Sequence, residues 1–316
     1  MKYYAGIDLG GMSAKAGIFC EGKLLAKGSV PTSKEDNYVT TVTKMAQLVR
    51  ELCARAGAKG VSAVGLAAPG IIDGRNGVVV SWTNYGWKDR PLASDLGKAL
   101  GVPVRLANDA NAAALGEAKF GAGKNYEDSI LITLGTGIGS GIILGGKIFD
   151  GFCGGGAEAG HMTIVVGGIP CPCGRRGCFE QYASASALIR DTKRAMFENR
   201  KSALWEFVGG NPELVDGKTA FEVARAGDAG AQQVVKNYIV YLAEGIANLV
   251  NIFRPQAIVL GGGISGEGEY LLRPLRKCVS ERLIVDAERI PLAILRALLG
   301  SEAGIWGAYA LAREDT

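Results

Sequence analysis

The chain has 316 residues, of which 48% are hydrophobic and 21% are charged, and its net charge is +4. This composition is typical of a soluble globular protein that is long enough for two domains. The positive charge is small and no Lys/Arg block concentrates it, so a nucleic-acid partner has no support. No signal-peptide pattern follows Met1 and the cysteines form no disulfide framework, so we expect a protein of the reducing cytoplasm.

One uncharged stretch, residues 129–146, resembles a membrane span in its length but contains six glycines. Glycine is a poor helix former, whereas it is frequent in tight turns between strands. The stretch therefore predicts a β-hairpin, and no membrane partner is expected.

In the first half of the chain, strands and helices follow one another as in an α/β domain. Apolar strands are predicted at residues 3–9, 14–19, 23–30, 61–67 and 102–106. Apolar side chains at the helical period predict an amphipathic helix at residues 38–56. A second helix is predicted from Pro91 to Gly101, and Asn108-Asp109 stands at the start of a third.

The second half begins with the same pattern of strand, glycine turn and strand. Ile132-Thr133-Leu134-Gly135-Thr136 is a weak repeat of Ile7-Asp8-Leu9-Gly10-Gly11. Further elements are expected as strands at 130–134, 141–144 and 257–260 and helical segments at 190–226, 228–253 and 302–311. We expect a small α/β domain of residues 1–108, completed by the C-terminal helix 302–316, and a large α/β domain of residues 109–301. No low-complexity linker separates the halves, so they are expected to pack across a cleft.

Both glycine turns, Gly10-Gly11 and 135–139, lead from a strand into a strand. Glycines let backbone N–H groups approach a phosphate, and Asp8 can hold the water shell of Mg²⁺; a plain hairpin turn is the alternative. Lys15, on the following strand, either adds a positive charge or is solvated surface. A P-loop sequence is absent, and a Rossmann turn would open a helix. The pattern favours the paired-hairpin phosphate clamp of actin-like ATPases and sugar kinases.

The only histidine, His161, precedes three cysteines in the pattern H-x9-C-x-C-x4-C, with the cysteines at 171, 173 and 178. Three thiolates and one imidazole complete the tetrahedral ligand set of structural Zn²⁺. Ordinary buried cysteines and a disulfide are the alternatives. An odd number of cysteines in one loop argues against the disulfide. The segment therefore predicts a zinc site formed by His161, Cys171, Cys173 and Cys178.

Asn108-Asp109 lies at the end of a predicted strand, where catalytic groups gather in open α/β sheets. Helix N-capping is the alternative role for this aspartate. Glu158 and Glu180 flank the predicted zinc segment. If zinc orders that segment, it also fixes His161 and Glu180 in space, and the second imidazole nitrogen is free to meet a ligand hydroxyl.

Together these segments resemble the ROK family of bacterial sugar kinases and repressors over nearly the whole chain. The resemblance is carried by Ile7-Asp8-Leu9-Gly10-Gly11, Ala68-Pro69-Gly70, Asn84-Tyr85-Gly86-Trp87, Asn108-Asp109-Ala110-Asn111, Gly135-Thr136-Gly137, Glu158-Ala159-Gly160-His161, Cys171-Pro172-Cys173-Gly174-Arg175-Arg176-Gly177-Cys178-Phe179-Glu180 and Gly261-Gly262-Gly263. It implies a two-domain actin-like ATPase (ribonuclease H-like) fold and ATP-dependent phosphorylation of a hexose, with glucose at O6 as the expected substrate. Met12 departs from the family pattern, which has Thr there, so a phosphate-side hydroxyl is lost or moved to Ser13.

The resemblance also implies the role of each residue. Asp109 would be the general base. The sugar would be bound by Gly70, Asn84, Asn108, Asp109, Glu158, His161 and Glu180. ATP and Mg²⁺ would be bound by Asp8, Gly10, Gly11, Lys15, Thr136, Gly137, Gly261, Gly262 and Gly263.

Alternatives remain at this point. The sugar could be N-acetylmannosamine, N-acetylglucosamine, fructose or allose, or the chain could be a non-catalytic sugar sensor like the family's repressors. Those repressors carry a DNA-binding domain before the first phosphate turn, and this turn begins at Asp8, so a kinase is expected. A purely structural zinc protein would leave the phosphate turns unexplained. Family resemblance further suggests a homodimer.

Overall fold

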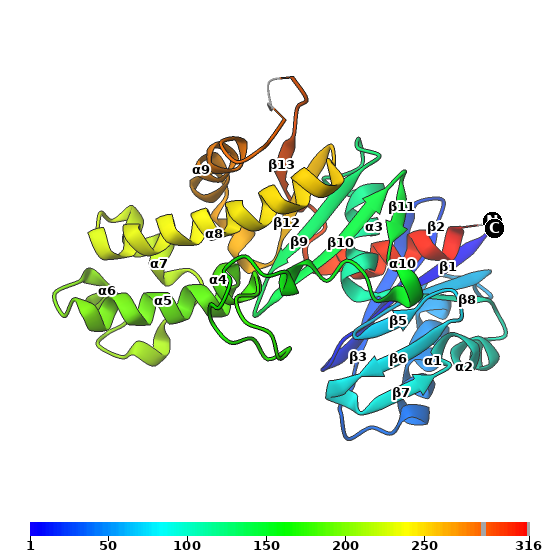
Figure 1. Ribbon diagram of the computed structural model, residues 1–316. Helices are drawn as coiled ribbons and strands as arrows, with labels where there is room; N and C mark the ends of the chain where they lie inside the picture. Colours follow the sequence, from blue (N-terminus) through cyan, green and yellow to red (C-terminus); the bar gives the residue numbers. More distant parts are fainter. Residues whose placement is uncertain (286–288, 315–316) are drawn as a thin grey trace. The chain divides into compact units, whose positions relative to one another are not determined.

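The computed structural model describes residues 1–285 and 289–314, and the chain divides into two compact units (Figure 1). The first unit consists of Met1–Leu131, Gly141–Ala157 and the C-terminal segment from Leu298. The second consists of Ile132–Ser140 and Glu158–Ala297. The C-terminal helix thus belongs to the same unit as the N-terminal part, and this unit extends past residue 108 through the next helix.

The first unit is built on a five-stranded sheet of order β3-β2-β1-β4-β8. Its strands are β1 (Tyr3–Leu9), β2 (Ser13–Cys20), β3 (Lys23–Pro31), β4 (Ala63–Ala68) and β8 (Val104–Asn108). The first three pair antiparallel, and β4 pairs parallel with β1 and β8. The predicted strands are confirmed.

Successive side chains of β1 point to opposite faces of this sheet, as in any β-strand. Ala5, Ile7 and Leu9 belong to a core cluster with the helices α1 (Tyr38–Arg55) and α2 (Leu92–Leu100). Tyr4 belongs to a second cluster with α10 (Ala303–Arg313). Asp8 has the same parity as Tyr4, so it lies on the α10 face.

Helix α10 packs closely on α3 (Asp109–Phe120) because glycines remove side chains from the contact. A Cβ atom added at Gly307 would lie 1.6 Å from the Ala112 carbonyl oxygen, and one at Gly116 would lie 2.5 Å from that of Ala303. Such contacts are impossible for any other residue, which explains why α3 is part of the first unit.

A small antiparallel sheet in the first unit has no counterpart among the predicted elements. It consists of β5 (Ile71–Asp73), β6 (Val78–Trp82) and β7 (Trp87–Arg90). A 3-10 turn, Thr83–Tyr85, connects the last two strands. The rings of Trp82 and Tyr85 stack at 3.8 Å beside Trp87, and this aromatic group fixes the turn.

A second five-stranded sheet has the order β11-β10-β9-β12-β13. Its strands are β9 (Ser129–Leu134), β10 (Ile138–Leu144), β11 (Lys147–Phe149), β12 (Ala257–Gly261) and β13 (Ala293–Arg296). As in the first sheet, three successive strands are followed by strands reached through helical connections. The β10–β11 pair is antiparallel and the β12–β13 pair parallel, which confirms the internal repeat.

The second unit also contains a group of helices (Figure 1). They are α4 (Glu180–Ala183), α5 (Ala185–Glu198), α6 (Ala203–Phe207), α7 (Thr219–Arg225), α8 (Ala229–Phe253) and α9 (Glu269–Ser280). Helix α8 is capped by the Asp228 carboxylate and ends at Arg254, one residue before Pro255. Among the helices of the described residues, none combines the length and apolar character needed to cross a membrane.

Candidate active site and metal centre

Asp8 lies near the end of β1, and its carboxylate packs against the first turn of α10. A Cβ atom at Gly304 would lie 2.5 Å from Asp8 Cγ, so glycine is needed there to make room for the carboxylate. Lys15 is the cross-strand partner of Asp8 in β2. Burial, and after it the charge of Asp109, raise the pKa of Asp8 to about 6, although the charge of Lys15 acts in the opposite direction.

The first glycine turn closes with a hydrogen bond from the Gly10 N–H to the Ser13 carbonyl, at 2.8 Å. The Tyr85 hydroxyl donates to the Gly11 carbonyl at 3.1 Å, so the turn that carries Asn84 is tied to this glycine turn. Met12 projects away from the protein, with 85% of its surface exposed. The structure therefore brings Asn84 and the first turn together within one unit.

Asn108, and not Asp109, is the N-cap of α3. Its side-chain oxygen accepts from the Ala110 N–H at 2.9 Å and the Asn111 N–H at 3.2 Å, while its amide donates to the Gly70 carbonyl at 3.1 Å. Gly70 has a φ of 93°, and a Cβ atom there would lie 2.2 Å from the Ser81 carbonyl oxygen. Helix capping is thus supplied by the neighbour of Asp109.

The Asp109 carboxylate is held at the first turn of α3, where it accepts from the Ala110 N–H at 2.8 Å. Burial raises the pKa of Asp109, although hydrogen bonds from the Ala110 and Asp109 amides and from Asn108 oppose that change. A partly buried carboxylate with a raised pKa is a better proton acceptor than an exposed one. The first unit therefore presents two partly buried acids, Asp8 and Asp109, and the charge of Asp109 contributes to the raised pKa of Asp8.

In the second unit, one loop gathers the four predicted zinc ligands. One ligand atom from each of His161, Cys171, Cys173 and Cys178 can be chosen so that all lie within 4.8 Å of one another. The Cys173 and Cys178 sulfurs are 3.7 Å apart, and the Cys171 sulfur is 3.7 Å from His161 Nδ1. Tetrahedral ligands at the usual Zn–S distance are separated by about 3.8 Å, so the donor set fits Zn²⁺.

Without a cation, burial favours the protonated form of two of the three thiols in this loop. Burial raises the pKa of Cys171 to about 12 and also raises that of Cys178, while a backbone hydrogen bond at Arg175 lowers that of Cys173. A bound cation reverses the cost of burying thiolates, because it supplies the opposite charge. The residues therefore fit a structural zinc ion.

Glu180 links the metal loop to the second glycine turn. Its Oε1 atom lies 3.3 Å from the Cys171 sulfur and 3.8 Å from His161 Nδ1. A Cβ atom at Gly137 would lie 2.7 Å from the other carboxylate oxygen. Glu180 is therefore positioned from both sides, by the loop and by the turn.

The remaining residues predicted for the second half lie in the same unit. The 3-10 turn Ala159–His161 follows Glu158, and the Ala159 N–H donates to the Ser140 hydroxyl at 3.0 Å. Gly262 has a φ of 80°, and a Cβ atom there would lie 2.4 Å from the Leu134 carbonyl oxygen, so the 261–263 turn packs on the end of β9. Each half of the predicted site is thus assembled within its own unit.

Three positioning residues were not foreseen: Tyr85, Ser140 and Gly304. Tyr85 and Ser140 stand beside predicted motif residues, but sequence position alone does not reveal their hydrogen bonds. Gly304 carried a signal, because the helix 303–313 has glycines at 304 and 307 on one face.

Comparison with known proteins settles the family. The model of the ROK family matches residues 4–315. The chain belongs to the ROK family. This ROK protein is 38% identical over 312 residues to the glucokinase of Streptomyces coelicolor, covering 98% of this chain and 97% of that one. Its fold is the two-domain actin-like ATPase fold that the sequence predicted.

A solved structure and a repressor complete the comparison. The ROK family glucokinase from Streptomyces griseus, in complex with glucose and AMPPNP, is 38% identical, covers 99% of each chain and has a TM-score of 0.80. The xylose repressor of Caldicellulosiruptor bescii is 32% identical over 259 residues, which cover 81% of this chain and 64% of the repressor. The likeness to the kinases therefore extends over more of both proteins.

Proposed function

We propose that this ROK protein phosphorylates glucose at O6 with ATP, giving glucose 6-phosphate and ADP. The observation that carries the proposal is its end-to-end likeness to a ROK glucokinase solved with glucose and an ATP analogue. The positions of the two buried acids in the first unit are consistent with that chemistry.

Asp109 is the proposed general base. As the sugar 6-hydroxyl oxygen attacks the γ-phosphorus, the bond from that phosphorus to the β–γ bridging oxygen breaks and ADP leaves. The sugar O–H bond breaks as well, and its proton passes to the Asp109 carboxylate. The hydrogen bond from the Ala110 N–H holds that carboxylate, and burial keeps its pKa above the ordinary range. Both features favour proton acceptance from a hydroxyl that is not acidic by itself.

Hydrogen bonds to the other sugar hydroxyls are assigned to residues of both units: Gly70, Asn84, Asn108, Glu158, His161 and Glu180. Many directional bonds distinguish a sugar from its epimers, because an inverted hydroxyl leaves buried groups unpaired. Asn108 has a fixed orientation through its cap and its bond to Gly70. Glu180 is fixed by the metal loop and Gly137.

Phosphate binding is assigned to the two glycine turns through Gly10, Gly11, Thr136 and Gly137, and Lys15 adds a positive charge. The glycines 261–263 are assigned to the adenosine. Asp8 would meet Mg²⁺ through water. The fit is chemical: a buried carboxylate whose pKa is raised to about 6 is short of positive charge, which a divalent cation supplies.

Zinc would be held by His161, Cys171, Cys173 and Cys178, and its role would be structural because the protein fills all four positions. With Nδ1 at the metal, the other His161 nitrogen is left for a sugar hydroxyl. The proposal includes a reducing cytoplasm, which keeps the thiols available, and a homodimer, which rests on family resemblance alone.

The test is a coupled assay of ADP release with glucose, mannose, galactose, N-acetylmannosamine, N-acetylglucosamine, fructose and allose under the same conditions. We expect the highest kcat/KM with glucose and a wide margin over galactose. A different sugar preferred by about tenfold, or about 1.4 kcal/mol, would replace glucose while leaving a hexose kinase. No ADP release with any sugar would favour the sugar-sensing alternative.

A further inference from the structure

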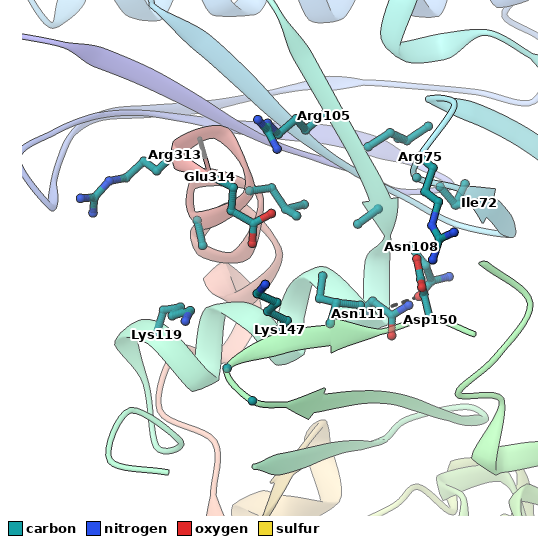
Figure 2. Close-up of a pocket in the computed structure, with 18 of the residues that line it drawn as sticks. Ile72, Arg75, Arg105, Asn108, Asn111, Lys119, Lys147, Asp150, Arg313 and Glu314 are labelled. Carbon is teal, nitrogen blue, oxygen red and sulfur yellow. Dashed lines mark hydrogen bonds between the residues drawn. The ribbon is translucent and has the colours of Figure 1, made fainter. Parts of the chain in front are cut away.

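A hollow of the first unit lies beside α3, and Asn108 is the one described residue in its wall that was given a binding role above (Figure 2). It has a volume of about 940 Å³, which is ample for a small organic ligand. It is bordered by the outer strand β8, the first and last turns of α3, the end of α10 and the β10–β11 hairpin. Asp8, Asn84 and Asp109 are not among the described residues that line it.

The hollow is strongly basic. Of the described residues in its wall, five are basic: Arg75, Arg105, Lys119, Lys147 and Arg313. Two are acidic, Asp150 and Glu314, so the formal charge of the wall is five minus two, or +3. Figure 2 shows the side chains of Arg105, Lys119 and Lys147 around the space. A low-dielectric concave wall of one sign concentrates the field and attracts anions.

One basic side chain lies against a glycine turn in this wall. Lys119 Nζ would be only 3.4 Å from a Cβ atom at Gly146, whose φ is 70°. The absence of a side chain on Gly145 and Gly146 leaves the ammonium group with an open approach to the hollow. The backbone of the hairpin is fixed below it by the hydrogen bonds from Gly145 to Asp128, at 2.7 Å, and from Gly146 to Glu127, at 2.9 Å.

A second, independent observation is that one buried side-chain oxygen in the wall of the hollow accepts no hydrogen bond. Asn111 lines the hollow and is 4% exposed, and its Oδ1 atom has no hydrogen-bond partner. A buried acceptor left unpaired costs about 1 to 3 kcal/mol, so a ligand that brings a donor hydroxyl would remove a real penalty.

We infer that this hollow binds a small phosphate monoester that also carries hydroxyl groups. Its phosphate would be held by Lys119, Lys147 and the neighbouring arginines, since charge-assisted bonds to phosphate are the strongest available to these side chains. A hydroxyl of the same ligand would donate to Asn111 Oδ1. The inference concerns binding and does not depend on the proposed kinase activity.

Calorimetric titration of the full chain at low ionic strength tests it, with glycerol 3-phosphate, inorganic phosphate and glycerol as probes. Glucose and AMPPNP are present throughout, so that the phosphate turns of the kinase site are occupied. We expect glycerol 3-phosphate to bind more tightly than inorganic phosphate and glycerol not to bind. The double variant Lys119→Gln/Lys147→Gln should raise the Kd for glycerol 3-phosphate by about tenfold or more, because two charged contacts are lost.

The matched control is Lys124→Gln, which removes an exposed lysine of the same unit that does not line the hollow. It should change the Kd by less than about twofold, as expected for a screened surface charge. Equal binding of the two phosphates would overturn the hydroxyl assignment to Asn111. No saturable binding, or equal Kd values in the double variant and the control, would overturn the site. Kinase activity of the double variant should be unchanged, and circular dichroism checks its fold.

Discussion

The two glycine turns have the same position in their strand repeats but different reasons for their glycines. At Gly11, an added Cβ atom would meet nothing within 4 Å, and at Gly10 it would meet only the turn's own Ser13 carbonyl, at 3.2 Å. At Gly137, an added Cβ atom would lie 2.7 Å from Glu180 Oε2. Neither Gly11 nor Gly137 has a positive φ, so backbone conformation does not demand glycine at either position.

The contrast separates two uses of glycine. In the first turn, protein packing leaves space above the backbone, which is what close approach of a phosphate would need. In the second turn, the space at Gly137 is taken by Glu180, which is itself fixed beside the metal loop. The first turn is thus open toward a ligand, while the second is coupled to the positioning of a side chain.

The largest expected effect is on the catalytic side of the first unit. Asp109→Asn keeps the shape of the side chain but removes the proton acceptor, so kcat should fall by at least about 100-fold with little change in the KM for glucose. Because burial disfavours the charge of Asp109, the variant should be no less stable than the wild type. Steady-state kinetics test the first statement and thermal unfolding tests the second. Near-normal turnover of the variant would show that Asp109 is not the general base.

The pH dependence of the free energy of unfolding should show the raised pKa of Asp8, the other acid of that unit. Its pKa is raised from 3.8 to about 6 in the folded protein, so the folded state binds more protons between these values. Stability due to this group is therefore present below about pH 4 and is lost as pH rises to about 6 and above. Without Mg²⁺, Asp8→Asn should raise the free energy of unfolding by about 2 kcal/mol at pH 7.5 and by about half as much at pH 5.

Asp36→Asn is a control of opposite sign. The Lys44 ammonium beside Asp36 lowers the pKa of that partly buried carboxyl, so its substitution should not stabilise the protein at pH 7.5. Chemical unfolding at both pH values measures the differences. If Asp8→Asn gave the same stability change at pH 5 and pH 7.5, the raised pKa would be refuted.

In the second unit, the metal loop should affect sugar binding through the residues attached to it. Cys173→Ala removes one zinc ligand, so bound zinc and melting temperature should fall, and the KM for glucose should rise by about tenfold because His161 and Glu180 lose their support. Cys278→Ala, at a half-buried cysteine outside the cluster, is the control and should retain zinc. Elemental analysis measures the bound zinc, and steady-state kinetics measure the KM for glucose. A metal-free variant with an unchanged KM for glucose would show that the metal loop does not position the sugar site.

Much of this arrangement was accessible from the sequence because it depends on local patterns. The helical period and its terminators predicted residues 228–253, and the structure has Ala229–Phe253. The spacing of His161 and the cysteines predicted a cluster, and in the structure its ligand atoms lie within 4.8 Å of one another. Regular periodicity and short-range motifs are what a sequence expresses most directly.

Other features depend on partners far along the chain and were not predicted. Helix α9 contains Pro274, a residue that normally indicates the end of a helix, so the sequence did not predict it. The three strands β5 to β7 are too short to show the alternating pattern of a strand. Glu117 is 1% exposed because it accepts from the Leu298 and Leu299 N–H groups at 3.1 and 2.7 Å, more than 180 residues away. A sequence shows a glutamate on a helix but not the distant amides that satisfy its charge.

The smallest expected effect tests the contrast between the two turns directly. Gly11→Ala places a methyl group in open space, so the melting temperature should stay close to that of the wild type while the KM for ATP rises by about fivefold, or roughly 1 kcal/mol. Gly137→Ala forces Glu180 to move, so it should also raise the KM for glucose by about fivefold. Each variant adds one methyl group to the wild-type chain. A difference between their effects on the KM for ATP and the KM for glucose therefore reflects the surroundings of each turn. If Gly11→Ala instead destabilised the fold and left the KM for ATP unchanged, the first turn would serve folding, and the openness of its glycines would have no link to phosphate.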